Sequence, residues 1–143
     1  MFAPTALLIA HTGKMARAEV INITLLGRIP SKKNSKMIVC RGRRPMLLPS
    51  EKHREWHIDA SNQLRKQKVP RNKIEKFDVH VWFYAPDIRK ADASNKWESV
   101  GDLLVDNEII KDDSWWNIQE LCIHTVELDR ENPRVELELT EVL

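Results

Sequence analysis

The stretch KFDVHVWFYAP, residues 76–86, constrains the fold more than any other part of the sequence. One set of its side chains is apolar and falls at every second position: Phe77, Val79, Val81 and Phe83. The side chains at the positions between them also include aromatic residues, Trp82 and Tyr84. A period of two with apolar groups in both sets predicts a central strand that is covered on both faces, and Pro86 ends it.

Further strands are predicted on both sides of this central strand. Their side chains alternate or are rich in β-branched residues, and turn residues separate them: residues 20–28, 37–41, 46–49, 117–129 and 134–142. The turn between the last two is Glu131-Asn132-Pro133.

Two helices are predicted between the strands. Ser50 has the chemistry of an N-cap for a helix over residues 50–68, which runs without glycine or proline. Its buried stripe is formed by Trp56, Ala60 and Leu64 and is extended by Ile58. Asp92 or Ser94 caps a second helix over residues 94–105. The order of elements predicts a single-domain α/β protein with a mixed β-sheet packed with two main α-helices.

We expect this domain to cover residues 19–143 and residues 1–18 to be a disordered leader. The apolar run from Ala6 to Ala10 is too short for a signal sequence or a membrane span. Cys40 and Cys122 are the only cysteines and form no CxxC motif, so a disulfide framework is excluded. The histidines show no zinc spacing with these cysteines. We therefore expect a cytoplasmic protein with reduced thiols and no membrane association.

The charges are segregated along the chain, although the net charge is only +2. Residues 28–73 are strongly basic. By contrast, DASNKWESVGDLLVDNEIIKDD, residues 92–113, holds seven of the 21 acidic residues. A basic segment beside an acidic one suggests a polyanion held next to a metal site.

The acidic stretch has a regular arrangement on the predicted helix. Asn95, Glu98 and Asp102 share one stripe, whereas the apolar residues around Trp97 lie on the other side. One interpretation is a set of surface carboxylates. The other is a site for a hard divalent cation such as Mg²⁺, which binds two or three carboxylates and supports phosphodiester cleavage.

The same stretch resembles the motif of the RusA family of Holliday junction resolvases. That motif is, roughly, Asp-x-Asp-Asn-x-x-Lys, then a mid-helix Asp, then Asp-Asp. Asp92, Asn95, Asp102 and the pair Asp112-Asp113 match it without a gap. Weaker similarity in IPSKKNS, in RRPMLLPSEKHREW and in RVELELTEV extends the resemblance over residues 20–142.

The resemblance implies a small homodimeric, Mg²⁺-dependent endonuclease that nicks four-way DNA junctions symmetrically, with Mn²⁺ able to substitute. It implies that Asp92 and Asp113 are catalytic metal ligands. Ser94 and Glu98 depart from the family's second Asp and its Lys. Because Glu98 lies one helical turn from Ser94, it is expected to supply the missing carboxylate as a third catalytic ligand. Lys96 or Lys90 is expected to supply the cation that stabilises the transition state.

Other residues are expected to support the site or bind DNA. Asn95, Asp102 and Asp112 would lie behind the metal ligands, with Asp102 holding Asn95 or a metal-bound water. The residues expected to contact DNA are Lys32, Lys33, Asn34, Lys36, Arg41, Arg43, Arg44, Arg89 and Lys90. Trp115 and Trp116 would either stack on a base or pack at a dimer interface.

Three alternatives remain open from the sequence. The substitutions at positions 94 and 98 are compatible with a junction-binding protein whose catalysis has decayed. The same residues suit a less selective nuclease for branched DNA. A purely structural acidic helix is the third. The favoured hypothesis is a resolvase of the phage type, acting in DNA recombination and repair in a bacterial or phage-infected cell.

Overall fold

The computed structural model describes residues 7–9, 15–17, 19–31, 36–42, 44–124 and 126–143. Side chains are described from Glu19 onward, except those of residues 32–41, 43–49 and 125. Within these residues the main sheet contains five strands: β3 (Val20–Leu26), β9 (Arg134–Glu141), β6 (Phe77–Ala85), β7 (Ile118–Ile123) and β8 (Glu127–Leu128). The two helices are α1 (Glu51–Lys66) and α2 (Ala93–Asp106). The predicted mixed α/β fold with two main helices is confirmed.

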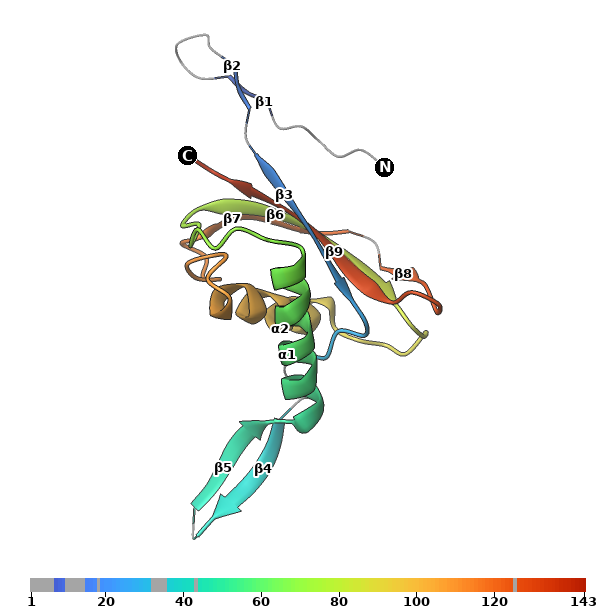
Figure 1. The fold of residues 1–143 in the computed structure, drawn as a ribbon. Helices are drawn as coiled ribbons and strands as arrows, with labels where there is room; N and C mark the ends of the chain where they lie inside the picture. The colour runs from blue at the N-terminus through green and yellow to red at the C-terminus, as the bar shows by residue number, and fades with distance from the viewer. Residues whose placement is uncertain (1–6, 10–14, 18, 32–35, 43, 125) are drawn as a thin grey trace.

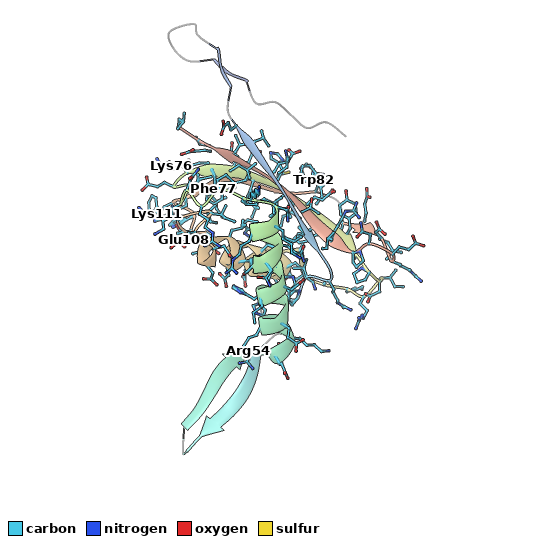
Figure 2. The ribbon with its side chains drawn as sticks, viewed as in Figure 1. Arg54, Lys76, Phe77, Trp82, Glu108 and Lys111 are labelled. Carbon is cyan, nitrogen blue, oxygen red and sulfur yellow. The ribbon has the colours of Figure 1, made fainter. Side chains whose placement is uncertain are left out.

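The central position predicted for residues 76–86 is also confirmed, but the predicted cover on both faces is wrong, because the set that contains His80, Trp82 and Tyr84 is only partly buried. Strand β6 pairs antiparallel with β9 on one side and parallel with β7 and β8 on the other. Its set from Phe77 to Phe83 is buried under the helices together with Leu137 and Leu139 of β9. Figure 1 shows both helices on the same side of the sheet. Figure 2 labels Phe77 and Trp82 on β6: Phe77 is fully buried, whereas Trp82 belongs to the opposite, partly exposed set.

Helix α1 begins as predicted at Ser50, whose side chain accepts a hydrogen bond from the backbone N–H of His53 at 3.2 Å. Trp56, Ala60 and Leu64 are buried as expected. The prediction for Ile58 is wrong, because its side chain is 64% exposed. Two residues of helix turn the chain by about 200°, which carries Ile58 away from the stripe that Trp56 begins.

Helix α1 also covers the outer edge of the sheet. The Gln67 side chain accepts from the N–H of Thr24 (3.0 Å) and donates to the Thr24 carbonyl (2.7 Å). Gln63 makes the equivalent pair with Leu26, at 2.7 and 3.1 Å. These bonds satisfy the outward-facing backbone groups of Thr24 and Leu26, so this part of the free edge of β3 is closed to another chain.

The region predicted as one strand over residues 117–129 is divided into β7 and β8. The strand β9 that follows does not form a hairpin with them, because β6 lies between β9 and both β7 and β8. The prediction that residues 117–129 are extended is confirmed for β7 and β8, whereas the prediction of one continuous strand is wrong.

Two small hairpins stand apart from the main sheet (Figure 1). One joins β4 (Lys36–Arg41) to β5 (Arg44–Pro49) and projects beyond the start of α1. The other joins β1 (Leu7–Ile9) to β2 (Met15–Arg17) in the segment expected to be a leader, and that domain boundary stays a prediction. In the described part of the chain, no helix is long and apolar enough to cross a membrane.

Candidate nuclease site

The start of α2 positions the first acid of the motif. Asp92 is the N-cap, and its carboxylate accepts from the backbone N–H of Ser94 at 3.0 Å and from the Ser94 hydroxyl at 2.7 Å. Helix N-termini favour such an acceptor both by hydrogen bonding and by the helix dipole. Ser94, which replaces an acid of the family motif, therefore contributes here by orienting Asp92.

The last acid of the motif lies against the middle of the same helix. A Cβ atom added to Gly101 would be 3.0 Å from Oδ2 and 3.4 Å from Cβ of Asp113. Gly101 thus leaves the space that Asp113 occupies beside α2. The buried residues Ile109 and Ile110 anchor the chain just before this turn.

Asp113 is in an electrostatic environment that favours a cation. Burial raises the pKa of its carboxyl above the ordinary value, and the negative charges of Asp102 and Asp112 raise it further. Asp112 also accepts a hydrogen bond from the backbone N–H of Asp113 at 2.8 Å. A divalent cation bound at Asp113 would relieve the repulsion that its carboxylate experiences from Asp102 and Asp112.

The stripe of Asn95, Glu98 and Asp102 lies, as predicted, on the side of α2 that faces away from the core. Glu98 is exposed and Asn95 and Asp102 are partly buried, whereas Trp97, Val100 and Leu104 are in the core.

The rise of a helix places Asp92 about 13 Å along the axis from Gly101, with Glu98 between them. The structure brings Asp102 and Asp112 near enough to Asp113 for their charges to raise its pKa. It places neither these three carboxylates nor those of Asp92, Glu98 and Asp113 within 4.8 Å of one another. The assignment of those three as metal ligands stays a prediction.

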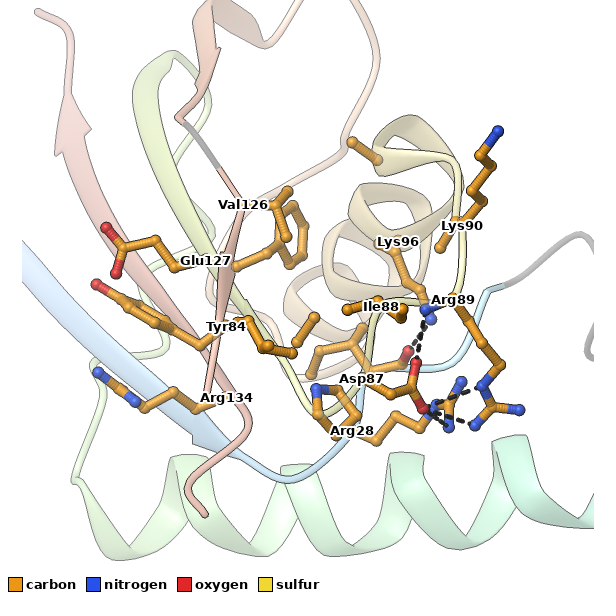
Figure 3. Close-up of a pocket in the computed structure, with 17 residues that line it drawn as sticks. Arg28, Tyr84, Asp87, Ile88, Arg89, Lys90, Lys96, Val126, Glu127 and Arg134 are labelled. Atoms are coloured by element: carbon orange, nitrogen blue, oxygen red, sulfur yellow. Dashed lines mark hydrogen bonds and ion pairs between the residues drawn. The ribbon is translucent and has the colours of Figure 1, made fainter. Parts of the chain in front are cut away.

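A basic pocket of about 360 Å³ opens beside the start of α2 (Figure 3). It is lined by the end of β6, the loop of residues 86–91, the first turn of α2 and residues 126–128. Its charged residues are predominantly basic: Arg28, Arg89, Lys90, Lys96 and Arg134, against Asp87 and Glu127. Arg89 and Lys90 were predicted from sequence, whereas Arg28 and Arg134 were not, because strands distant in sequence bring them there.

Asp87 organises the arginines of this pocket. Its carboxylate accepts from Arg89 at 2.8 and 3.0 Å and from Arg28 at 3.2 Å. These contacts, chiefly the hydrogen bonds from Arg89, lower the pKa of Asp87 to about 2. Asp87 is therefore ionised at neutral pH and holds the two guanidinium groups side by side.

Lys96 connects α2 to the segment of chain that precedes Lys32 and Lys33 in sequence. Its ammonium group donates to the carbonyl of Ile29, and the neighbouring Ser99 hydroxyl donates to the carbonyl of Pro30 at 2.7 Å. Burial, and then the charge of Arg28, lower the pKa of Lys96. The two contacts fix residues 29 and 30 against α2, two positions before Lys32 in sequence.

Most of the predicted DNA-binding residues lie outside the described side chains. Lys32, Lys33, Asn34 and Arg43 are outside the described residues altogether. The backbones of Lys36, Arg41 and Arg44 lie in the β4–β5 hairpin, and their side chains are not described. Trp115 and Trp116 follow Asp113 and are 80% and 74% exposed.

A family model described as Endodeoxyribonuclease RusA matches residues 28–140. The matched region contains α1, α2, β6, β7, β8 and all of β9 except its last residue, together with the acidic residues and the basic pocket. No match was found among curated proteins.

Proposed function

Because the chain belongs to the RusA endodeoxyribonuclease family, we propose that it is a Mg²⁺-dependent nuclease that resolves four-way DNA junctions by symmetric cleavage. The observation that carries the proposal is the position of Asp113 against Gly101, beside Asp102 and Asp112 and with its pKa raised. We propose that it acts in recombination and repair of DNA, in the cytoplasm of a bacterial or phage-infected cell.

The available donors fit a hard divalent cation. They are carboxylate oxygens on a rigid helix and the turn packed against it, and Mg²⁺ or Mn²⁺ prefers such oxygens. We assign Asp92, Glu98 and Asp113 as ligands, with Asp102, Asp112 and Asn95 behind them. When bound, the cation would supply an activated water and neutralise charge on the scissile phosphate. Cleavage would leave 5′-phosphate and 3′-hydroxyl ends.

The basic pocket supports the binding of a DNA strand beside these carboxylates. Arg28 and Arg89 are paired by Asp87, so they present a preformed pair of donors to a phosphate. Lys90 is exposed at the rim and is placed for a further phosphate contact. Lys96 borders the same pocket, where its partly buried ammonium is placed to stabilise developing negative charge.

We propose that two copies of the chain act on one junction. A four-way junction presents two equivalent strands, and a twofold dimer offers two equivalent sites. The exposed pair Trp115 and Trp116 adjoins Asp113 and provides aromatic surface either for stacking on a base or for the dimer contact.

The substrate class is tested by comparing cleavage of a mobile four-way junction, a fork and a linear duplex, each in Mg²⁺ and in Mn²⁺. We expect paired nicks at symmetric positions in the junction and slower cleavage of the other substrates. Equal cleavage of fork and junction would instead indicate a less selective nuclease. Junction binding without cleavage in either metal would indicate a binding protein with decayed catalysis, and either result would contradict the proposal.

A further inference from the structure

We propose that His80, Cys122 and His124 form a Zn²⁺ site on the face of the sheet opposite the helices. Their donor atoms all lie within 4.8 Å of one another, the one such group of histidine, cysteine and acidic side chains found in the described part of the chain. The site does not depend on the proposed nuclease function. It uses none of the residues assigned to that function, and β6 separates its side chains from α2.

The parallel pairing of two strands creates this cluster. His80 of β6 and Cys122 of β7 are direct partners in the register. His124 follows Cys122 by two residues, so it projects to the same face, and its backbone N–H donates to the Val81 carbonyl at 2.9 Å. Three donors from two neighbouring strands therefore converge, although 42 residues separate His80 from Cys122 in sequence (122 − 80).

The donor atoms are already close together. Nδ1 of His80 and Nε2 of His124 share a hydrogen bond of 3.0 Å, which a bound zinc ion would replace. That distance is close to the spacing of about 3.3 Å between two nitrogens on a tetrahedral zinc ion. The Trp82 ring stacks on His124 with centroids 4.4 Å apart and an interplanar angle of 2°. This stacking fixes the plane of the imidazole, so little ordering is required when a metal binds.

The chemistry of the ligands selects the metal. A thiolate with two imidazoles suits Zn²⁺ and disfavours Mg²⁺, which prefers oxygen donors. The three side chains are only partly buried, which leaves an entry path and room for water as the fourth ligand. Glu138 of β9, directly across from His80, is only 7% exposed, and a bound cation would offset the cost of burying its carboxylate.

Zinc at this position would cross-link the central strand β6 to the end of the parallel strand β7, directly before the chain turns toward β8. We therefore expect Zn²⁺ to stabilise the folded chain, because the three donors converge only in the folded state.

The test uses the full chain, first stripped with a chelator. Co²⁺, a spectroscopic substitute for Zn²⁺, is titrated while the thiolate-to-metal charge-transfer absorption is recorded. Binding of Zn²⁺ is then measured by competition and by the change in Tm. The variants are Cys122→Ser and His124→Gln, and the matched control is Cys40→Ser, which removes the other cysteine of the chain.

We expect one equivalent of Co²⁺ to produce the charge-transfer band in wild type and Cys40→Ser, and not in Cys122→Ser. His124→Gln should weaken Zn²⁺ binding by at least about a hundredfold. This is more than is expected when a residue that only hydrogen-bonds to a metal ligand is removed. At about a hundred times the Kd, Zn²⁺ should raise the Tm of wild type by about 9 °C.

The proposal is overturned if wild type gives no thiolate band at excess Co²⁺. It is equally overturned if Cys122→Ser keeps the band, or if His124→Gln binds Zn²⁺ as tightly as wild type. Circular dichroism of each stripped variant separates loss of the site from loss of the fold. Since the readouts are spectroscopic and thermal, failure here leaves the nuclease proposal unaffected.

Discussion

At the scale of single residues, the position of Asp113 favours the binding of a cation and at the same time lowers the stability of the metal-free protein. Its position beside Asp102 and Asp112 suits a cation, but in the absence of a cation the same position penalises the ionised carboxylate. Gly101 provides the space in which this acid is held. The candidate site is thus expected to reduce the stability of the protein on which it is built.

Asp113→Asn should stabilise the metal-free protein at neutral pH. The folded state raises the pKa of Asp113 above 3.8, so it binds this proton more tightly than the unfolded chain does. Stability therefore falls as the pH rises from the unfolded pKa through the raised folded pKa, and it stays lower above that window. Because solvent screens this partly exposed group, we expect a gain of roughly 0.5 kcal/mol, or about 2 °C in Tm at pH 7.

Thermal melts in chelator at pH 7 and below about pH 3 measure this effect. The difference between Asp113→Asn and wild type should be present at pH 7 and vanish below about pH 3, where the carboxyl is protonated in both states. Added Mg²⁺ should raise the Tm of wild type and leave that of the variant nearly unchanged. A variant less stable than wild type at pH 7 would contradict the electrostatic account of Asp113.

Gly101→Ala should impair cleavage without unfolding the protein. The added Cβ would contact Oδ2 of Asp113 at 3.0 Å, so the carboxylate must shift by a few tenths of an ångström. Alanine also favours the helix by about 1 kcal/mol, which limits any loss of stability. Because small displacements of catalytic groups are costly, we expect about a tenfold slower junction cleavage at unchanged helicity. Wild-type cleavage by this variant would show that the packing of Asp113 on α2 is not needed.

At the scale of elements, Ser99 and Lys96 hold α2 to the chain at Ile29 and Pro30. Ser99 is fully buried, and its hydroxyl is the hydrogen-bond donor to the Pro30 carbonyl. Removing that donor leaves a backbone acceptor unsatisfied beside the core. This contact links the acidic helix to the segment that carries Lys32 and Lys33.

Ser99→Ala should lower the free energy of unfolding by about 1–3 kcal/mol, as measured by urea denaturation. The matched control is Ser94→Ala on the same helix, whose hydroxyl and partner Asp92 are both exposed. That control should cost less than about 0.5 kcal/mol. Equal costs in the two variants would refute the importance of the contact with Pro30.

Local sequence patterns predicted the elements well and their partners poorly. The alternation in residues 76–86, the cap at Ser50 and the stripe of Trp97, Val100 and Leu104 all reflect short-range physics, and the structure confirms them. The neighbours of β6 depend on contacts between distant segments, so the interposition of β6 between β9 and β7 was missed.

The same limit explains which functional residues the sequence revealed. The acidic residues lie within one helix and its following turn, where the 3.6-residue period places them. The convergence of His80 with Cys122 depends on the parallel register of β6 and β7, and Arg28 meets Asp87 only through the folded chain. No spacing rule along the sequence predicts either contact.

At the scale of the whole molecule, a chain of net charge +2 is proposed to bind DNA through a localised basic surface. Such binding releases counterions, so the logarithm of affinity should fall linearly with the logarithm of salt concentration. Lys90→Gln, at the rim of the pocket, should reduce this slope by about one. The control is Lys76→Gln at the opposite end of β6 (Figure 2), which should leave the slope unchanged. Equal slopes for Lys90→Gln and wild type would exclude Lys90 from the DNA contact.

The central claim is that the carboxylates on and beside α2 cleave a four-way junction in the presence of Mg²⁺. The most direct measurement is the rate of paired nicking of a mobile four-way junction by wild type, Asp113→Asn and Glu98→Gln, with Glu55→Gln on α1 as a matched control. We predict symmetric nicks for wild type and the control, and at least about a hundredfold slower cleavage for the two site variants. Junction cleavage that survives both site variants, or that proceeds equally well in a chelator, would contradict the claim.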